Sequence, residues 1–144
     1  FLASGKVGAV QMTAFANILQ ETGRAGLFRV VMIHHPPWRG ATNPGRGLRD
    51  AAEFENIIAL HGAELVLHGH NHRRMQKLLP GANGAVPVVG AGSASAVPGS
   101  PRHLAEYHLY DVSRSGNGWS LRARVRGVAE AGGDIIDLGE LQLT

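Results

Sequence analysis

The fold is decided by a short apolar run that ends in two histidines and two prolines, Val30-Val31-Met32-Ile33-His34-His35-Pro36-Pro37. Its Val and Ile content predicts a buried strand over 28–33, because continuous apolar runs of this length are typical of strands covered on both faces. A similar run, Leu65-Val66-Leu67, predicts a second buried strand over 64–67 and leads into His68-Gly69-His70-Asn71-His72. Each predicted strand therefore ends directly in a block of histidines.

A helix is predicted between these two strands, from Ala51 to about His61. Asp50 is placed to cap its first turn, with Glu53 three residues later at the spacing of a capping box, and Gly62 ends it. Strand, helix and strand with short connections form a βαβ unit, so the two strands should run parallel. Because the carboxyl ends of parallel strands meet at one edge, we expect both histidine blocks there, where open α/β sheets bind ligands.

The flanking segments extend this unit in different ways. Before it, 7–22 is predicted to form a helix, because apolar residues recur there at helical spacing. The residues expected on the buried faces of the two helices are Met12, Phe15, Ile18, Leu19, Phe54, Ile57 and Ile58. After Arg74 we expect an antiparallel, β-rich tail, with strands at 86–89, 106–112, 119–128 and 135–141 and a hairpin connection at 113–118. The expected fold is α/β, a parallel βαβ unit and its tail in a single domain over residues 1–144.

Composition narrows the classes of function. The chain has 144 residues, of which 44% are hydrophobic and 17% charged, which is typical of a globular domain. It contains no Cys, which excludes disulfides, thiolate metal sites and a thiol nucleophile. A formal net charge of +3 suits an anionic substrate, whereas no basic stripe interleaved with aromatic residues predicts nucleic acid as a partner. No apolar run is long enough to span a bilayer and no signal peptide is visible, so we expect no membrane partner and a cytoplasmic location.

The histidine blocks themselves indicate a metal site. Neutral imidazole is the most common metal-ligating side chain. His70 and His72 stand two apart in an expected extended turn, so both can point to one centre, and Gly69 permits a tight backbone approach. With nitrogen and oxygen donors but no thiolate, Mn, Fe or Zn fits better than a soft metal or an iron–sulfur cluster. The alternative is that these histidines are only capping and turn residues.

The two blocks resemble the last two signature blocks of the calcineurin-like metallophosphoesterases. The resemblance lies in 30–37 and in 67–72. The run Val86-Pro87-Val88-Val89-Gly90-Ala91-Gly92-Ser93-Ala94, followed by a strand that contains Tyr107, is similar to the cyclic-nucleotide phosphodiesterase-like branch. The resemblance covers most of the chain, and it is specific in the histidine blocks and looser after Arg74.

This resemblance implies that the chain is part of a four-layer α/β/β/α sandwich with two metals at the carboxyl edge. His34 and His70 would ligate one metal, and His72 would ligate the other. A hydroxide bridging the metals would attack phosphorus in line, while the metals neutralise charge that develops on the phosphoryl oxygens. The implied substrate is a phosphoester, with a cyclic nucleotide as one candidate. No side chain is assigned a catalytic role other than binding metal.

Three neighbours of these ligands are candidates for holding them in place or meeting substrate: His35, Asn71 and Arg73. An equal alternative for His35 is a role in local packing. An equal alternative for Arg73 is that it lies in a solvated loop. The alternating arginines of 121–126 are either a phosphate-attracting stripe or, as is more typical, the solvated face of a half-buried strand. The Gly-rich segment 90–93 is either a phosphate cradle or, more typically, a turn after a strand.

A two-metal site also needs carboxylate or amide ligands, one of which bridges the metals. The family supplies them from Asp-x-His, Gly-Asp and Gly-Asn-His blocks that precede the His-His-Pro-Pro block. Only 33 residues precede His34 here, and they contain neither Asp nor His. We therefore expect the carboxyl-terminal half of such a hydrolase, with no metal or one incompletely ligated metal and no phosphodiesterase activity alone. We also expect an uncovered flank, closed by the missing half or by self-association.

Two other functions remain open. One is a non-catalytic module that uses the same histidine rim to bind a single metal or another ligand. The other is a full-length nuclease or protein phosphatase of the same superfamily, since fold alone does not determine the substrate. Metal content separates the hydrolase from the module, because the complete hydrolase binds two metals per chain.

Overall fold

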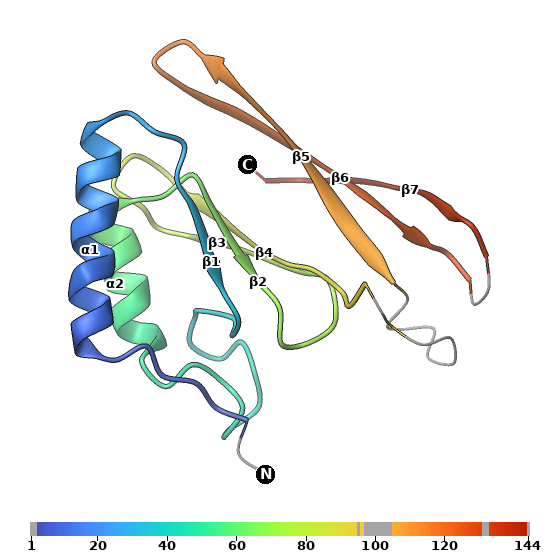
Figure 1. Ribbon diagram of the computed structural model, residues 1–144, viewed down its shortest axis with the longest axis horizontal. Helices are drawn as coiled ribbons and strands as arrows, with labels where there is room; N and C mark the ends of the chain where they lie inside the picture. The colour runs from blue at the N-terminus through green and yellow to red at the C-terminus, as the bar shows by residue number, and fades with distance from the viewer. Residues whose placement is uncertain (1–2, 95, 97–104, 131–132, 144) are drawn as a thin grey trace.

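The computed structural model describes residues 3–94, 96, 105–130 and 133–143. Its fold is α/β, with two helices, a mixed and mostly parallel four-stranded sheet, and a three-stranded antiparallel sheet (Figure 1). The elements in chain order are α1 (Ala9–Arg24), β1 (Val30–Ile33), α2 (Ala51–His61), β2 (Leu65–His68), β3 (Met75–Leu79), β4 (Val86–Gly90), β5 (Glu106–Ser115), β6 (Gly118–Val128) and β7 (Ile135–Leu141). The helices cover one face of the four-stranded sheet and the antiparallel sheet lies over the other, so the described chain forms three layers.

The βαβ unit predicted from the sequence is confirmed. β1 and β2 pair in parallel, with Val30 opposite Leu65 and Ile33 opposite His68. The helix between them has the predicted bounds, and it lies beside α1 on the same face of the sheet (Figure 1). Neither helix in the described part of the chain is long and apolar enough to cross a membrane.

The first core lies between the helices and the four-stranded sheet. Its buried side chains include Met12, Leu19, Phe54, Ile58, Val66 and Val88. Phe15 stacks on Phe54 with ring centroids 5.2 Å apart. Ile18, however, is 57% exposed, so its predicted place in the core is wrong. The buried stripe of α1 contains Met12, Phe15 and Leu19. Ile18 lies at the border of that stripe, on the side of the helix that faces solvent.

β4 corrects the expectation that the whole tail is antiparallel. It pairs in parallel with β2, with Val66 opposite Val88, so the strand order is β1-β2-β4-β3. All five residues of β4 are buried, as a strand between two layers requires. β3 is not predicted by the sequence, and it closes the sheet as an antiparallel edge strand with Lys77 opposite Val88. Three of its five residues are exposed, so it shows neither alternation nor a continuous apolar run.

The antiparallel sheet has the order β5-β6-β7 and confirms the three predicted strands of the tail. The hairpin connection predicted at 113–118 is shorter than expected, because the strands continue to Ser115 and begin again at Gly118. β5 and β6 form a long hairpin in which Ser115 pairs with Gly118. The turn between them places Gly116 at φ 55°, a conformation that glycine adopts without steric cost. Buried side chains from both sheets form the second core, and these are Leu65, Val89, Ala123, Val125, Leu141 and Leu143.

Asp50 joins the two helices, which corrects the predicted capping box. It stands at the N-cap position of α2 but makes no side-chain hydrogen bond to that helix. Its carboxylate instead accepts hydrogen bonds from the N–H groups of Val7 and Gly8, at 3.0 and 2.8 Å, directly before α1. The first turn of α1 contains no acidic residue, so Asp50 supplies the negative charge that a helix N-terminus favours. The segment before α1 therefore lies against the loop before α2.

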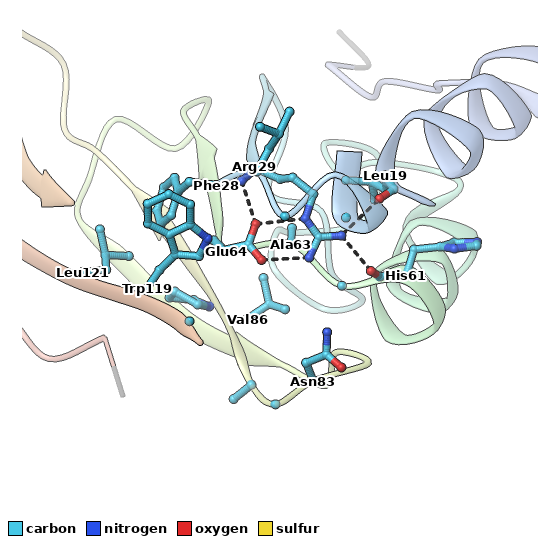
Figure 2. Close-up of a pocket in the computed structure, with 18 of the residues that line it drawn as sticks. Leu19, Phe28, Arg29, His61, Ala63, Glu64, Asn83, Val86, Trp119 and Leu121 are labelled. Atoms are coloured by element: carbon cyan, nitrogen blue, oxygen red, sulfur yellow. Dashed lines mark hydrogen bonds and ion pairs between the residues drawn. The ribbon is translucent and has the colours of Figure 1, made fainter. Parts of the chain in front are cut away.

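The amino-terminal edge of the parallel strands holds an ion pair between the buried Arg29 and the partly buried Glu64 (Figure 2). Nη2 and Nε of Arg29 donate to the two carboxylate oxygens of Glu64 at 2.8 and 2.9 Å. Nη1 donates to the carbonyl oxygens of Leu19 and His61, at 3.1 and 2.9 Å, and so reaches both helices. This network lines a hollow of about 740 Å³. Trp119 of the antiparallel sheet also lines it and lies beside Phe28 and Glu64 (Figure 2).

β1 forms an outer edge of the first sheet, and one of its faces is uncovered. Val30 is 46% and Met32 80% exposed, whereas Val31 and Ile33 pack against the helix-side core. Successive side chains of a strand point to opposite faces, so the two exposed residues lie on the face that the antiparallel sheet covers farther along. An exposed apolar face of this kind agrees with the expected uncovered flank, and what covers it stays a prediction.

Candidate metal site at the carboxyl edge of the sheet

Both histidine blocks lie at the carboxyl-terminal edge of the parallel strands, as the βαβ topology predicts. His34 follows β1 directly, and His68, the last residue of β2, leads through Gly69 into His70. The Gly69 N–H donates to the His34 carbonyl oxygen at 3.0 Å. This hydrogen bond ties the two histidine loops to each other at the point where the strands end.

Three histidines gather here, and we call His34, His35 and His70 the histidine cluster. One ring nitrogen of each lies within 4.8 Å of the others. Nε2 of His34 is 3.3 Å from Nδ1 of His70, and the ring centroids of His35 and His70 are 4.3 Å apart. At 3.3 Å at most one of the two facing nitrogens carries a hydrogen, so at least one presents a lone pair.

The donor set of the cluster fits one transition-metal ion. Metal–imidazole bonds of about 2.0–2.1 Å in tetrahedral geometry place two ligand nitrogens roughly 3.4 Å apart. The facing nitrogens of His34 and His70 already have close to this separation. Nε2 of His70 is also buried without a hydrogen bond of good geometry among the described residues, although the Arg46 backbone lies near enough to act on the pKa of this ring. No carboxylate belongs to the cluster in the described ranges, so the cluster does not by itself provide for a pair of metals.

His35 is held in the cluster by the segment before α1. Its Nε2 lies 2.9 Å from the Ala3 carbonyl oxygen, which only accepts, so this nitrogen donates and the neutral ring keeps its lone pair on Nδ1. Metal-binding histidines usually make such a hydrogen bond through the nitrogen that does not bind the metal. Gly5 allows the close approach, since a Cβ there would lie 2.6 Å from Nδ1 of His35. The sequence does not place His35 among the predicted ligands, and the structure brings it beside two of these, His34 and His70.

The loop that carries His70 and His72 is compact, which corrects the expected extended turn. The two residues have φ values of 67° and 50°, and they are the only non-glycine residues of the described ranges with positive φ. A left-handed backbone costs a residue with a Cβ about 1 kcal/mol. Strain of this kind concentrates at functional sites, where the surrounding structure enforces it.

A hollow of about 1070 Å³ opens beside the cluster, and we call it the rim hollow. Of the predicted site residues, His34, His70, Asn71, His72 and Arg73 line it. The structure thus collects the predicted ligands and two of their three predicted neighbours around one space. His72 lines the hollow but does not belong to the histidine cluster.

The loop 38–49 closes the hollow on one side. Asn71 donates through Nδ2 to the Ala41 carbonyl oxygen at 3.3 Å, and so holds this loop against the second histidine block. Arg46 of the same loop lines the hollow near His70. Burial lowers the pKa of His70, and the positive charges of the neighbouring histidines and of Arg46 lower it further. His70 is therefore biased toward the neutral form, which is the form that binds a metal.

Two weaker sequence signals have structural explanations. In the Gly-rich segment 90–93, the Gly92 N–H donates to Oε1 of Glu106 at 3.2 Å, so a carboxylate of the protein is bound there. Glu106 also contacts Arg74 at 2.6 Å and the buried His108 at 3.3 Å, which joins β5 to the end of the second histidine loop. Two of the alternating arginines of β6 make ion pairs with acidic residues of β5 and β7, as the exposed face of a strand often does.

Arg46 is the site residue that the sequence does not mark. Its loop is rich in Gly and Pro and directly follows the first histidine block, which is the signal that it approaches the site. The loop also contains Arg39 and Arg49, and composition alone does not say which of the three lines the hollow. Arg39 instead pairs with Glu55 at 2.8 Å, away from the histidines.

Comparison with models of known protein families finds no match to this chain. A search of curated proteins likewise finds none. Function is therefore inferred from the residues and the geometry of the site.

Proposed function

We propose that this chain binds a transition metal through the histidine cluster and serves a metal-dependent phosphoester hydrolase of the calcineurin-like type. The observation that carries the proposal is the 3.3 Å approach of His34 Nε2 to His70 Nδ1, beside a hollow that is also lined by Arg46 and Arg73. Imidazole nitrogens suit the metal, and positive charge in the adjoining hollow suits an anionic phosphoester.

In this proposal His34 and His70 bind one metal, and His72 contributes to a second. When bound, the metals supply Lewis-acid chemistry, which stabilises charge on the phosphoryl oxygens and activates water for attack. The hydrogen bond from Gly69 to His34 and the one from Asn71 to the loop 38–49 keep the ligand loops together. The cluster contains no carboxylate, so the bridging ligand and the remaining ligands must come from a further segment or a second chain.

The other parts of the hydrolase are proposed on the same basis. The α/β/β layers of the described chain would form the carboxyl-terminal half of a four-layer α/β/β/α sandwich of the cyclic-nucleotide phosphodiesterase-like branch. The other half, or a second copy of this chain, would cover Val30 and Met32 on the exposed face of β1. Mn, Fe or Zn is the proposed metal, a phosphoester such as a cyclic nucleotide the substrate, and the cytoplasm the compartment. Substrate profiling separates this enzyme from a nuclease or a protein phosphatase.

A metal titration tests the proposal. We expect the metal-free chain to bind one Zn²⁺ in competition with a chelator of known affinity. His70→Ala should weaken this binding at least about tenfold, because even loss of a group that supports a ligand costs that much. His61→Ala is the matched control, since His61 ends α2 at the opposite edge of the sheet. Equal Zn²⁺ affinities of the two variants would contradict the proposed site.

Activity gives a second check on the ligand set. With Zn²⁺ or Mn²⁺ present, the pure chain should not turn over bis(4-nitrophenyl) phosphate, because its cluster lacks a bridging carboxylate. Turnover that His70→Ala abolishes would show that the chain already holds a complete centre. The missing-ligand part of the proposal would then be wrong.

A second function, a non-catalytic module that binds one metal, is favoured by the position of His35. It completes a set of three imidazoles with His34 and His70, whereas His72 stands outside that set. His35→Ala therefore discriminates the two functions in the same Zn²⁺ titration, with His72→Ala beside it. A loss of affinity in His35→Ala supports the module, in which three imidazoles bind the metal. An unchanged affinity in both variants supports the ligand set of the hydrolase, in which His35 binds no metal and His72 contributes only to a second one.

A further inference from the structure

The rim hollow carries positive charge without a matching carboxylate. Its charged lining residues are Arg46, from the loop 38–49, and Arg73, from the second histidine block. No Asp or Glu lines it in the part of the chain that the structure describes. Thr42 and Asn43 add hydroxyl and amide groups to the same wall. The hollow thus offers hydrogen-bond donors and positive charge together.

The two arginines of the hollow belong to the described arginines that have no carboxylate partner. Four arginines contact a carboxylate at 2.6–2.8 Å, and these are Arg29, Arg39, Arg74 and Arg122. For Arg46 and Arg73, the described ranges contain no such ion pair. Their charges come from two separate loops and meet around one space.

The backbone beneath Arg46 is held in place before any ligand arrives. The Arg46 N–H donates to the Asn43 carbonyl oxygen at 3.2 Å, which closes a turn. The next residue, Gly47, accepts a hydrogen bond from the Gly5 N–H at 3.1 Å, so the turn is fastened to the segment before α1. A binding group on a preformed turn loses less conformational entropy when its ligand binds.

We propose that Arg46 and Arg73 form an anion subsite that binds the phosphoryl group of a phosphoester. A guanidinium group is planar and presents its donors as a fork that matches two oxygens of a phosphate. A hollow of about 1070 Å³ has room for the phosphoryl group and for the organic group attached to it. The choice of a phosphoester rests on the proposed function, whereas binding of the anion requires no metal.

The test is phosphate binding by the chain after its metals have been removed with a chelator. The probe is inorganic phosphate, followed by calorimetry at low ionic strength, with phenyl phosphate as the ester. We expect Arg46→Gln and Arg73→Gln each to weaken phosphate binding about tenfold, the loss that corresponds to a hydrogen bond to a charged group. Arg122→Gln is the matched control, because it removes the same charge from the antiparallel sheet. Its phosphate affinity should stay within about twofold of the parent chain.

The variant Arg46→Lys tests whether a loss of phosphate affinity in Arg46→Gln reflects only the lost charge or a folding defect. Lysine keeps the charge but not the fork, so we expect an affinity between those of the parent chain and Arg46→Gln, with an unchanged circular dichroism spectrum. Equal weakening by all three Gln variants, or no saturable phosphate binding, would overturn the subsite. Phosphate binding without phenyl phosphate binding would overturn the ester assignment. The Zn²⁺ titration reads the metal separately, so loss of Zn²⁺ binding without loss of phosphate binding points to a failure of the proposed function alone.

Discussion

The two edges of the parallel strands place their charged residues in opposite ways. At the amino edge, the guanidinium of Arg29 meets a carboxylate and two backbone carbonyls, and each of its three nitrogens donates at least one hydrogen bond (Figure 2). At the carboxyl edge, three imidazoles crowd together and Arg46 and Arg73 share a hollow that no carboxylate lines in the described ranges. The first arrangement holds the layers together, and the second leaves polar groups available to a ligand. This contrast supports the proposal that the metal site lies at the carboxyl edge, because unsatisfied polar groups are typical of functional sites.

The largest expected effect on stability comes from removing the Arg29–Glu64 ion pair at the amino edge. Glu64→Gln leaves the guanidinium of Arg29, whose side chain is 8% exposed, without its counter-charge. We expect a loss of about 3 kcal/mol in the free energy of unfolding, because an unmatched charge in the interior is costly. Urea unfolding of the two proteins measures it.

Glu55→Gln is the control for that experiment. It removes the partner of Arg39, which is 75% exposed, so the free energy of unfolding should change by no more than about 0.5 kcal/mol. Losses of similar size in the two variants would show that the amino-edge ion pair has no special structural role.

The strain of the second histidine loop gives a smaller effect. His72→Gly and His72→Ala both remove the imidazole, but only glycine adopts φ 50° without cost. The glycine variant should therefore be the more stable of the two by about 1 kcal/mol. At the next position, Arg73, φ is not positive, so glycine should be the less stable replacement there. The same order at both positions would rule out backbone strain at His72.

Acidification should lower the free energy of unfolding, because two histidines near the carboxyl edge have lowered pKa values. Burial lowers the pKa of His68, and burial lowers the pKa of His108 although its contact with Glu106 acts to raise it. The unfolded chain, with histidine near 6.5, then binds more protons than the folded chain as the pH falls. The stabilisation is therefore complete above pH 6.5 and is lost progressively as the pH falls from 6.5 through the lower pKa values of the folded state.

Urea unfolding at a series of pH values from 8 to 5 measures this loss. His108→Gln, which keeps hydrogen-bonding groups but does not titrate, should reduce the dependence on pH. A free energy of unfolding that stays constant or rises between pH 7 and pH 5 would contradict the pKa directions.

The position of the site could be predicted from the sequence because it follows from topology. Parallel strands that end at Ile33 and His68 deliver both histidine blocks to one edge, whatever the side chains do afterwards. The membership of the cluster could not be predicted in the same way. Side chains alternate only while the chain is a strand, and β1 ends at Ile33, so His34 and His35 are free to approach one another, with centroids 5.0 Å apart.

Features that depend on residues far away in the chain could not be predicted from the sequence either. Asp50 has the spacing of a local cap, but its carboxylate finds Val7 and Gly8 instead. The strand β3 has no periodic pattern and exists because β4 offers it an edge. The continuous apolar run of β4, by contrast, was a usable signal of a parallel, doubly covered strand.

The hydrogen bonds from Val7 and Gly8 to Asp50 link the start of α1 to a residue far along the chain. The carboxylate that receives the Gly8 N–H lies 42 residues farther along, so this N–H gains its partner only after a long loop has closed, at an entropic cost. The segment fastened by this contact also carries the carbonyl that orients His35. Burial acts to raise the pKa of Asp50, but its backbone hydrogen bonds hold the pKa below 3.8. The carboxylate therefore stays ionised, and keeps its hydrogen bonds to Val7 and Gly8, until the solution is strongly acidic. Amide hydrogen exchange should accordingly show the first turn of α1 and the loop before α2 opening as one cooperative unit.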